Sequence, residues 1–239
     1  MGRDTVDLTL VVPVRNEENR LPACLDGVLG TLAGLPITSS VLIVDNASTD
    51  RSAQIAEGWR AHAARAGVPL TLASCPQRGK GAAVRAGMLA ATGRYVGFCD
   101  ADLATSMTAL RPALALLEAG INVVIGSRAH PDSDVSARHS AARQAGAWLF
   151  RRSVARVVPG ISDTQCGFKF FRREAVQRAL TRCRVSDFAF DVELLRWIQR
   201  AGGRIVELPV CWTDDARSSL RPVRDGFAAL HSVLSLRVG

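Results

Sequence analysis

Residues 95–102 have the sequence YVGFCDAD, a short apolar run that ends in two aspartates one residue apart. The same pattern, an apolar run followed by polar residues, recurs at 8–17 (LTLVVPVRNE) and at 41–46 (VLIVDN). Short apolar runs of this kind, separated by helix-length segments, are typical of strands buried in a parallel sheet. The sequence therefore predicts an α/β fold whose strands end in polar loops.

Segments with helical spacing of apolar residues alternate with these runs. Helices are expected at 17–32, 52–65, 82–91 and 108–118, and further strands at 70–73 and 123–125. This order predicts a Rossmann-like, mostly parallel sheet with helices on both faces, which binds ligands beyond the carboxyl ends of its strands.

The alternation becomes looser after residue 128. We expect a polar loop, a basic helix, a second helix, a strand and a final helix, at 130–137, 141–158, 191–201, 205–208 and from 222 onward. We interpret this part as a small antiparallel C-terminal elaboration of one domain that spans 1–239.

Composition excludes several classes of protein. The chain has 239 residues, of which 48% are hydrophobic and 22% charged, so it is long enough and apolar enough to fold around a core. No apolar run approaches the ~18–20 residues that span a bilayer, and the N-terminus has no cleavable signal pattern. The six cysteines form no CxxC pair, which argues against a zinc site and predicts reduced thiols in the cytoplasm.

The net charge of +8 is carried by one half of the chain. Residues 1–127 contain 11 basic and 11 acidic residues, whereas residues 128–239 contain 19 and 11. A basic half indicates an anionic partner such as nucleic acid, a membrane surface or a phosphorylated substrate, although a solvated arginine-rich surface is an equally simple explanation. Aromatic content of 5% offers no stacking platform, so we expect no nucleic-acid partner.

Asp100 and Asp102 are the residues that most clearly indicate chemistry. Two carboxylates one residue apart, just beyond a buried strand, suit a hard divalent cation, Mg²⁺ or Mn²⁺, that also binds substrate phosphates. The alternative is an Asp-rich turn before the helix that starts near Ser106. GxGxxG and GxxxxGK[ST] are both missing, which counts against a nicotinamide-dependent oxidoreductase and a P-loop NTPase.

Four segments in order resemble the family 2 glycosyltransferases, which have the GT-A fold: VVPVRNEEN (11–19), VDNASTD (44–50), RGKGAAVRAG (78–87) and CDADLAT (99–105). Four more resemble a narrower group, the dolichyl-phosphate glucose synthases and their bacterial polyprenyl-phosphate relatives. They are GSRAH (126–130), ISDTQCGFKFF (161–171), DFAFDVELL (187–195) and CWTDDARSSLRPVRDG (211–226). One departure is Leu103, where the family often has glycine after the acidic triplet.

This resemblance implies a nucleotide-sugar-binding half at 1–127 and an acceptor-binding half at 128–239. It assigns donor binding to Pro13, Arg15, Glu17, Asp45, Arg78, Lys80, Asp100, Ala101 and Asp102. Asp45 would accept a hydrogen bond from the imide N–H of uracil. Asp100 and Asp102 would hold the Mg²⁺ or Mn²⁺, which offsets charge on the departing diphosphate.

The resemblance also implies an acceptor site that holds a lipid phosphate. It assigns acceptor binding to Arg128, Arg138, Gln165 and Lys169, and a direct part in the reaction to Asp102, Arg128, Asp163 and Asp191. A phosphate monoester is largely ionised near pH 7, so its transfer needs positive charge more than a strong base. For a hydroxyl acceptor Asp191 would be the general base; for a phosphate it would orient sugar hydroxyls or cations.

We therefore expect an inverting, metal-dependent glycosyltransferase that moves a hexose, glucose from UDP-glucose, to a polyprenyl phosphate. The same fold acting on a soluble hydroxyl acceptor is the nearer alternative; a nucleotidyltransferase and a nucleic-acid-binding protein are the other classes. The segment 222–237 and the face of 148–158 are apolar with basic flanks, which predicts peripheral contact at the inner face of the membrane.

Overall fold

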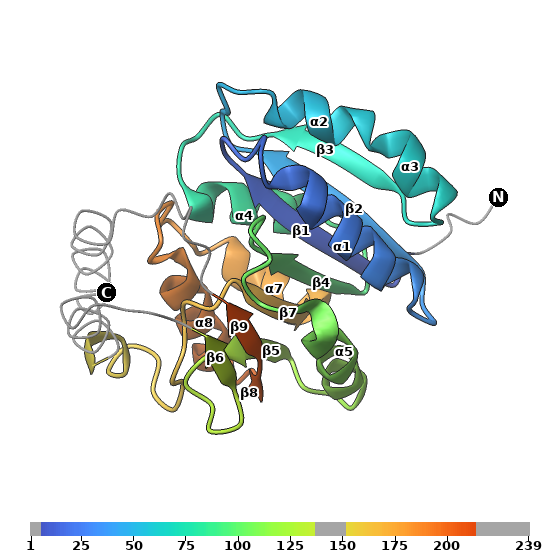
Figure 1. Cartoon of the computed structure of the whole chain (residues 1–239). Helices are drawn as coiled ribbons and strands as arrows, with labels where there is room; N and C mark the ends of the chain where they lie inside the picture. Colours follow the sequence, from blue (N-terminus) through green and yellow to red (C-terminus); the bar gives the residue numbers. More distant parts are fainter. Residues whose placement is uncertain (1–5, 137–151, 214–239) are drawn as a thin grey trace.

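The computed structural model describes residues 6–136 and 152–213. Within these ranges the chain forms a seven-stranded sheet with the order β3-β2-β1-β4-β7-β5-β8 (Figure 1). The strands are β1 (Leu8–Val14), β2 (Ser39–Asp45), β3 (Leu70–Ser74), β4 (Tyr95–Cys99), β5 (Val123–Ser127), β7 (Phe168–Arg172) and β8 (Ile205–Pro209). A two-stranded sheet joins β6 (Asp134–Ser136) to β9 (Cys211–Thr213).

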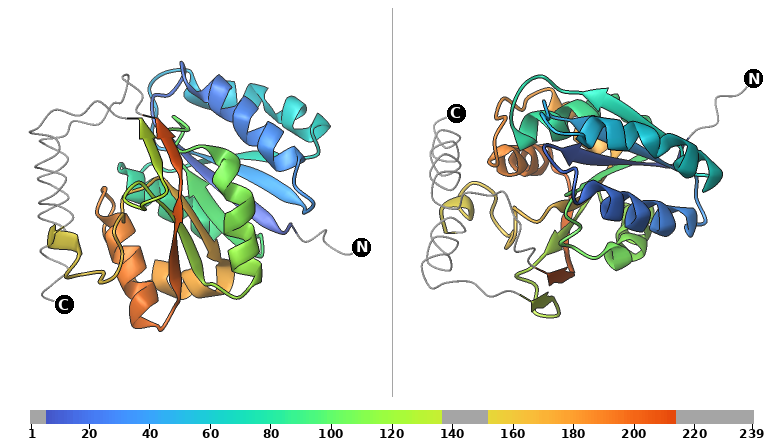
Figure 2. Two further views of the ribbon diagram at one scale, coloured as in Figure 1. Left: turned by 60° about the horizontal axis from the view of Figure 1, so that its bottom comes forward. Right: turned by 45° about the horizontal axis from the view of Figure 1, so that its top comes forward.

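Helices cover both faces of the main sheet (Figure 2). One face packs against α1 (Leu21–Ala33), α2 (Ser52–Gly58), α3 (Arg60–Arg65), the short η1 (Met107–Ala109) and α5 (Leu110–Glu118). The other packs against α4 (Lys80–Ala90), α7 (Arg173–Leu180) and α8 (Phe190–Arg200). The expected α/β fold with two helical layers is therefore confirmed.

The strand β7 runs against its neighbours. It pairs antiparallel with β4 and β5, whereas the other ladders of the main sheet are parallel. Cys99, the last residue of β4, is opposite Phe168, the first of β7. The loop that enters β7 therefore lies at the edge where β4 and β5 end.

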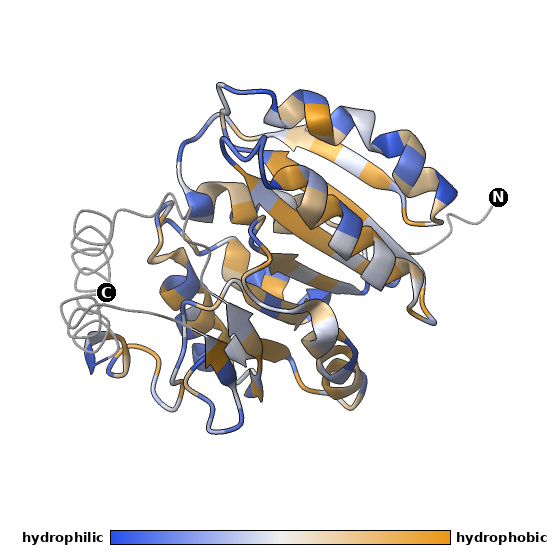
Figure 3. Ribbon diagram, viewed as in Figure 1, coloured by the Kyte–Doolittle hydropathy of each residue, from blue (hydrophilic) through white to orange (hydrophobic). Residues whose placement is uncertain are grey.

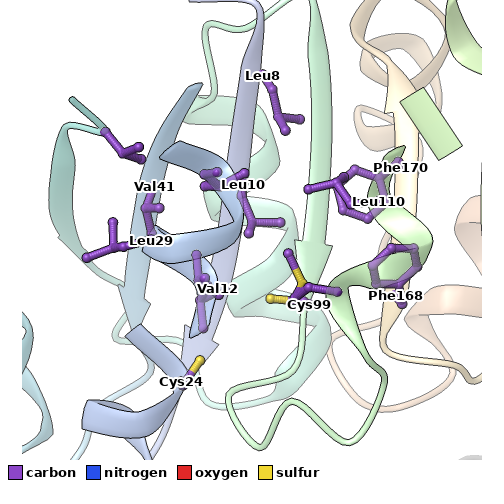
Figure 4. Close-up of a cluster of buried hydrophobic side chains, with 14 of the residues drawn as sticks. Leu8, Leu10, Val12, Cys24, Leu29, Val41, Cys99, Leu110, Phe168 and Phe170 are labelled. Atoms are coloured by element: carbon purple, nitrogen blue, oxygen red, sulfur yellow. The ribbon is translucent and has the colours of Figure 1, made fainter. Parts of the chain in front are cut away.

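Apolar side chains fill the space between the sheet and each helical layer. Figure 4 shows Leu10 and Val12 of β1 facing Leu29 of α1, with Phe168 and Phe170 of β7 beside Leu110 of α5. Figure 3 shows the same pattern as hydropathy: the strands are largely hydrophobic and several connecting loops hydrophilic. This core fixes the strand ends from which the polar loops extend.

Two details differ from the expectations, and two expected helices are left largely untested. The segment 52–65 is divided at Trp59, which ends α2 and precedes α3, instead of forming one helix. The expected antiparallel elaboration is wrong for the small sheet: β6 and β9 are parallel, and the antiparallel strand is β7, inside the main sheet. Most of the expected helix at 141–158 and all of the one from 222 lie outside the described residues.

The described residues contain no helix long and apolar enough to cross a bilayer.

Gly97 of β4 provides a test of the packing. A Cβ at this position would overlap the ring of Phe170, so Gly97→Ala should lower the free energy of unfolding by about 1–3 kcal/mol, measured by urea denaturation. Gly30→Ala, on α1, is the control, because no atom lies within 4 Å of an added Cβ there. It should raise the free energy of unfolding by about 0.5–1 kcal/mol. Equal effects of the two variants would contradict this packing.

Candidate active site

The loops that follow β1 and β2 are joined to each other by hydrogen bonds. The backbone N–H of Asn16 donates to Ser48 Oγ at 3.1 Å, and the backbone N–H of Thr49 donates to Asn16 Oδ1 at 2.8 Å. The Glu17 N–H donates to Ser52 Oγ at 2.8 Å. These contacts hold the segment that contains Pro13, Arg15 and Glu17, which are expected to bind the nucleotide sugar, against the end of β2.

Glu17 and Asp45 occupy this corner with different partners. Arg20 donates to both oxygens of Glu17, from Nε at 2.6 Å and from Nη2 at 2.8 Å. Burial raises the pKa of Glu17 even though Arg20 acts in the opposite direction. Asp45 Oδ1 is buried without a hydrogen-bond partner among the described residues. An unpartnered buried carboxylate oxygen is an acceptor available to a ligand N–H.

Asn46 fixes the loop that carries Arg78 and Lys80. Its Nδ2 donates to the carbonyls of Cys75 at 3.0 Å and Gln77 at 2.7 Å, and its Oδ1 accepts from the Gly79 N–H at 2.9 Å. Gly79 has a φ of 129°, and a Cβ there would overlap the Ser186 carbonyl. The glycine is therefore required, and α4 begins with Lys80 directed at the carboxylate pair.

Asp100 is held from two sides at the end of β4. Lys80 Nζ lies 2.6 Å from its Oδ1, and its own N–H donates to the Gly167 carbonyl at 3.1 Å. A Cβ on Gly167 would overlap the Asp100 carboxylate, so glycine leaves the room that this side chain needs. Burial acts to raise the pKa of Asp100, but the positive charge of Lys80 outweighs it and lowers that pKa.

Asp102 has a different environment. Burial, followed by the negative charge of Asp100, raises the pKa of Asp102. Its Oδ1 accepts from the Ala104 N–H at 3.0 Å, while Ala101 between the aspartates is buried. Beside Asp102 a groove of about 600 Å³ opens between α1, the loop 103–107 and β9.

The two aspartates suit a divalent cation by donor chemistry. Both offer carboxylate oxygens. Burial and, after it, the negative charge of Asp100 raise the pKa of Asp102, and a bound cation would offset both effects. In the described parts of the chain no set of three or more histidine, cysteine or carboxylate ligands gathers around a common point. Phosphate oxygens and water would therefore complete the coordination.

Arg128 follows β5 and is oriented by Asp163. Its Nε and Nη2 donate to the two carboxylate oxygens of Asp163 at 2.7 and 2.8 Å, and its N–H donates to Oδ2 at 3.0 Å. Its guanidinium also stacks over the ring of Trp212 on β9, 5.5 Å from the centroid. Burial opposes ionisation of Asp163, but Arg128 lowers the pKa of Asp163 to about 2.

The loop 163–167 is anchored on β8. Glu207 accepts from the N–H groups of Ser162 and Asp163, each at 2.9 Å. The Gln165 N–H donates to Asp163 Oδ1 at 3.1 Å, and its Nε2 is buried without a partner among the described residues. Gln165 therefore has a donor without a partner among the described residues, and its part in acceptor binding stays a prediction.

Lys169 is placed differently from an exposed acceptor-binding lysine. It is 0% exposed and its Nζ lies 2.7 Å from Asp191 Oδ1, so its expected part in acceptor binding stays a prediction. The physical reason for its burial is that β7 is covered on both faces, which turns a lysine on it into a core residue. Asp191 is present at the N-terminus of α8, as expected, but it is 3% exposed and paired. Arg138 lies outside the described residues.

Three contributors to the site were missed from the sequence. Asn46 and Gly167 appear in the sequence analysis only as parts of longer segments, and Glu207 does not appear there. Asn46 stands next to Asp45 and Gly167 next to Cys166, so their positions inside the quoted segments were the available signal. Glu207 carries no local signal, because its partners are more than forty residues away.

Solved structures share this fold. Glucosyl-3-phosphoglycerate synthase from Mycobacterium tuberculosis superposes with a TM-score of 0.70 at 19% identity, covering 97% of this chain and 80% of that one. Its complex with Mn²⁺, UDP and glucosyl-3-phosphoglycerate gives a TM-score of 0.68 at 18% identity, covering 98% and 79%. At this identity the likeness establishes the fold alone, and that fold is the expected GT-A fold.

Other proteins are more similar to this chain in sequence than these solved structures are. Dolichyl-phosphate beta-glucosyltransferase from Drosophila melanogaster is 37% identical over 241 residues, covering 91% of this chain and 70% of the relative. The enzymes of that name from Homo sapiens and Dictyostelium discoideum are 35% and 32% identical, covering 91% and 98% of this chain and 71% and 75% of their own. The family model described as glycosyl transferase family 2 matches residues 9–180. The chain belongs to glycosyl transferase family 2.

Proposed function

We propose that this chain transfers glucose from UDP-glucose to a polyprenyl or dolichyl phosphate, with inversion at the sugar carbon and with Mg²⁺ or Mn²⁺. The observation that carries the proposal is the loop 163–167. It brings Arg128, a cation suited to an anionic acceptor, to the same edge of the sheet as Asp100 and Asp102. The relatives at 32–37% identity are named for this reaction.

The donor would bind at the ends of β1, β2 and β4. Asp45 Oδ1, which has no partner among the described residues, suits the imide N–H of uracil. Glu17, which accepts hydrogen bonds from Arg20, lies close to it. Lys80 and the exposed Arg78 lie on the loop before α4, where they would meet the diphosphate. Lys80 would then exchange its contact with Asp100 for one with a phosphate oxygen.

Asp100 and Asp102 would hold the divalent cation. When bound, such a cation acts as a Lewis acid that stabilises negative charge on the departing nucleoside diphosphate. Asp100 is kept ionised by Lys80, while Asp102, with its raised pKa, gains most from a neighbouring positive charge. Ala101 between them is small and buried, so the two carboxylates extend from a fixed backbone.

The contacts of Arg128 support its proposed role in binding a phosphate acceptor. Asp163 occupies Nε and Nη2, and Trp212 supports the plane of the guanidinium, which leaves Nη1 for an oxygen of the acceptor. Holding the side chain in one geometry reduces the entropy lost on binding. The phosphate is its own nucleophile, because its second pKa is about 6 and it is largely ionised at neutral pH.

The alternative, a hydroxyl acceptor, would need a general base. Asp191 is the candidate for that role, but its Oδ1 lies 2.7 Å from the Lys169 ammonium and its side chain is 4% exposed. A carboxylate that is buried and already in contact with an ammonium is poorly placed to meet an acceptor hydroxyl. The geometry therefore favours the phosphate acceptor.

Peripheral contact with the inner face of the cytoplasmic membrane is part of this proposal, since a polyprenyl phosphate keeps its chain in the bilayer. The support is the excess of basic residues in 128–239. The segment 222–237, expected to lie on the membrane, is outside the described residues. Flotation with anionic vesicles at low and high salt is the measurement for this part.

Asp102→Asn tests the cation site. The variant keeps the shape and one oxygen but loses a charged ligand, so kcat for glucose transfer to a short polyprenyl phosphate should fall by roughly 100-fold or more. Product formation is followed by mass spectrometry, and thermal unfolding checks that the variant is folded. Asp26→Asn, which removes an exposed carboxylate on α1, is the control and should keep full activity. Full activity of Asp102→Asn, or of the wild type in EDTA, would contradict the assignment.

Arg128→Ala tests the acceptor site. Loss of one charge-assisted contact costs about 1.5–3 kcal/mol, so kcat/KM for the acceptor should fall roughly 10- to 150-fold. UDP affinity, measured by calorimetry, should change by less than about twofold. Weaker UDP binding with an unchanged acceptor KM would mean that Arg128 serves the donor instead.

The Arg128–Asp163 pair also predicts a pH dependence of stability. The pKa of Asp163, about 2, is below its ordinary value of about 3.9, so the ionised carboxylate stabilises the fold above pH ~4 and loses this effect as the pH falls toward 2. Asp163→Asn should therefore be less stable than the wild type at pH 6, with a smaller difference at pH 3, in urea titrations. A difference that stays constant or grows at pH 3 would argue against the pair.

A further inference from the structure

Lys169 is an ammonium in the middle of the hydrophobic sheet. Its neighbours across β7 are Phe98 of β4 and Ile125 of β5, and the Phe98 ring centroid is 5.2 Å from its Nζ. The residue is 0% exposed. Taking an ammonium out of water is strongly destabilising unless it is paired and hydrogen-bonded, so its partners determine whether this arrangement is stable.

Those partners come from two different segments. Nζ lies 2.7 Å from Asp191 Oδ1, at the start of α8, and donates to the Cys166 carbonyl at 2.5 Å. One ammonium thus connects the N-terminus of α8 to the loop 163–167. Because both contacts are buried, neither is weakened by competition with water.

The loop 163–167 in turn touches both groups of functional residues. At one end Asp163 binds the guanidinium of Arg128 through two hydrogen bonds. At the other end Gly167 accepts the N–H of Asp100 and borders its carboxylate. Cys166, which the ammonium holds, lies between these two contacts. A shift of the loop would therefore change the distance between Asp100 and Arg128.

We propose that Lys169 and Asp191 are positioning residues: their buried ion pair fixes the loop 163–167 and so sets the placement of Asp100 relative to Arg128. Asp191 is then a counter-ion, not the proton acceptor of the reaction. The proposal rests on the proposed function, in which Asp100 serves the donor side and Arg128 the acceptor side. A displacement of about 1 Å between reacting groups can cost about 100-fold in rate.

The double variant Lys169→Met/Asp191→Asn tests this. It removes both charges and nearly keeps both shapes, so the lost attraction is offset by the desolvation cost that two buried charges no longer carry. We expect a melting temperature near that of the wild type, a kcat for transfer at least tenfold lower, and a KM for UDP-glucose within twofold. The single variant Lys169→Met should melt at a lower temperature, because it leaves an uncompensated charge.

Glu193→Gln is the matched control. Glu193 is on the same helix, is also 3% exposed, and accepts from the N–H groups of Arg184 and Val185, away from the loop 163–167. It should lower the melting temperature and leave kcat unchanged. If kcat of the double variant returns to the wild-type value together with its stability, the pair is merely structural and the proposal is wrong.

The role as proton acceptor is distinguished by the single variants. If Lys169→Met kept its kcat while Asp191→Asn lost it, together with the acidic limb of the pH–rate profile, Asp191 would be the base and the proposal would be overturned. Under the proposal both variants lose kcat and neither changes the shape of that profile. If the double variant does not fold, the kcat and melting temperature of Asp191→Asn are compared with those of the wild type and of Glu193→Gln instead.

Hydrogen exchange separates this proposal from the proposed function. The Gln165 N–H is hydrogen-bonded within the loop, and the Asp100 N–H donates to it. The Asp163 N–H donates from the loop to Glu207 of β8. These amides should exchange at least tenfold faster in the double variant than in the wild type and stay protected in Glu193→Gln. A wild type that transfers no glucose to polyprenyl phosphate would refute the proposed function only; unchanged exchange would refute the positioning role.

Discussion

The reversed direction of β7 is the constraint on which the site depends. In a fully parallel sheet, the edge at which the strands end would carry only segments that leave strands. Because β7 runs antiparallel between β4 and β5, the segment that enters it lies at that same edge. This places the loop 163–167 between Asp100, which follows β4, and Arg128, which follows β5. The loops that follow β4 and β5 are thereby connected to each other through the loop 163–167.

Charge at this edge is arranged in pairs. Glu17 is bound by Arg20, Asp100 by Lys80, Asp163 by Arg128, and Asp191 by Lys169. Two carboxylates remain in a different state: Asp102 has a raised pKa, and Asp45 has a buried oxygen without a partner among the described residues. The paired carboxylates fix the geometry of the site. In the proposed function, Asp102 would gain a cation as its partner and Asp45 the base of the nucleotide.

Local pattern was sufficient to predict the strands and the polar loops after them, because apolar runs and the residues that end them are neighbours in sequence. It was not sufficient for strand direction, which depends on contacts between distant segments; this is why β7 and the β6–β9 pair were not foreseen. Lys169 shows the same limit. On a strand buried on both faces, alternation does not distinguish a core position from an accessible one. The resemblance indicated that Arg128 and Asp163 matter, but not that they bind each other across 35 positions.

Backbone strain is concentrated in the loops that follow β1, β2 and β4. In the described part of the chain the non-glycine residues with positive φ are Asn16, Ala47 and Leu103, at 55°, 55° and 47°. Such a conformation costs about 1–2 kcal/mol for most residues, and strain of this kind persists only where surrounding contacts impose it.

Leu103 shows how that cost is offset. Its Cδ1 lies 3.0 Å from where a Cβ on Gly27 of α1 would be. The leucine side chain thus fills space that a glycine on the helix leaves open, exchanging backbone freedom for packing. Because Leu103 directly follows Asp102, this contact with α1 also anchors the backbone that carries the carboxylate. Gly27 on the helix and Leu103 in the loop therefore fit each other, and their contact holds the backbone beside Asp102.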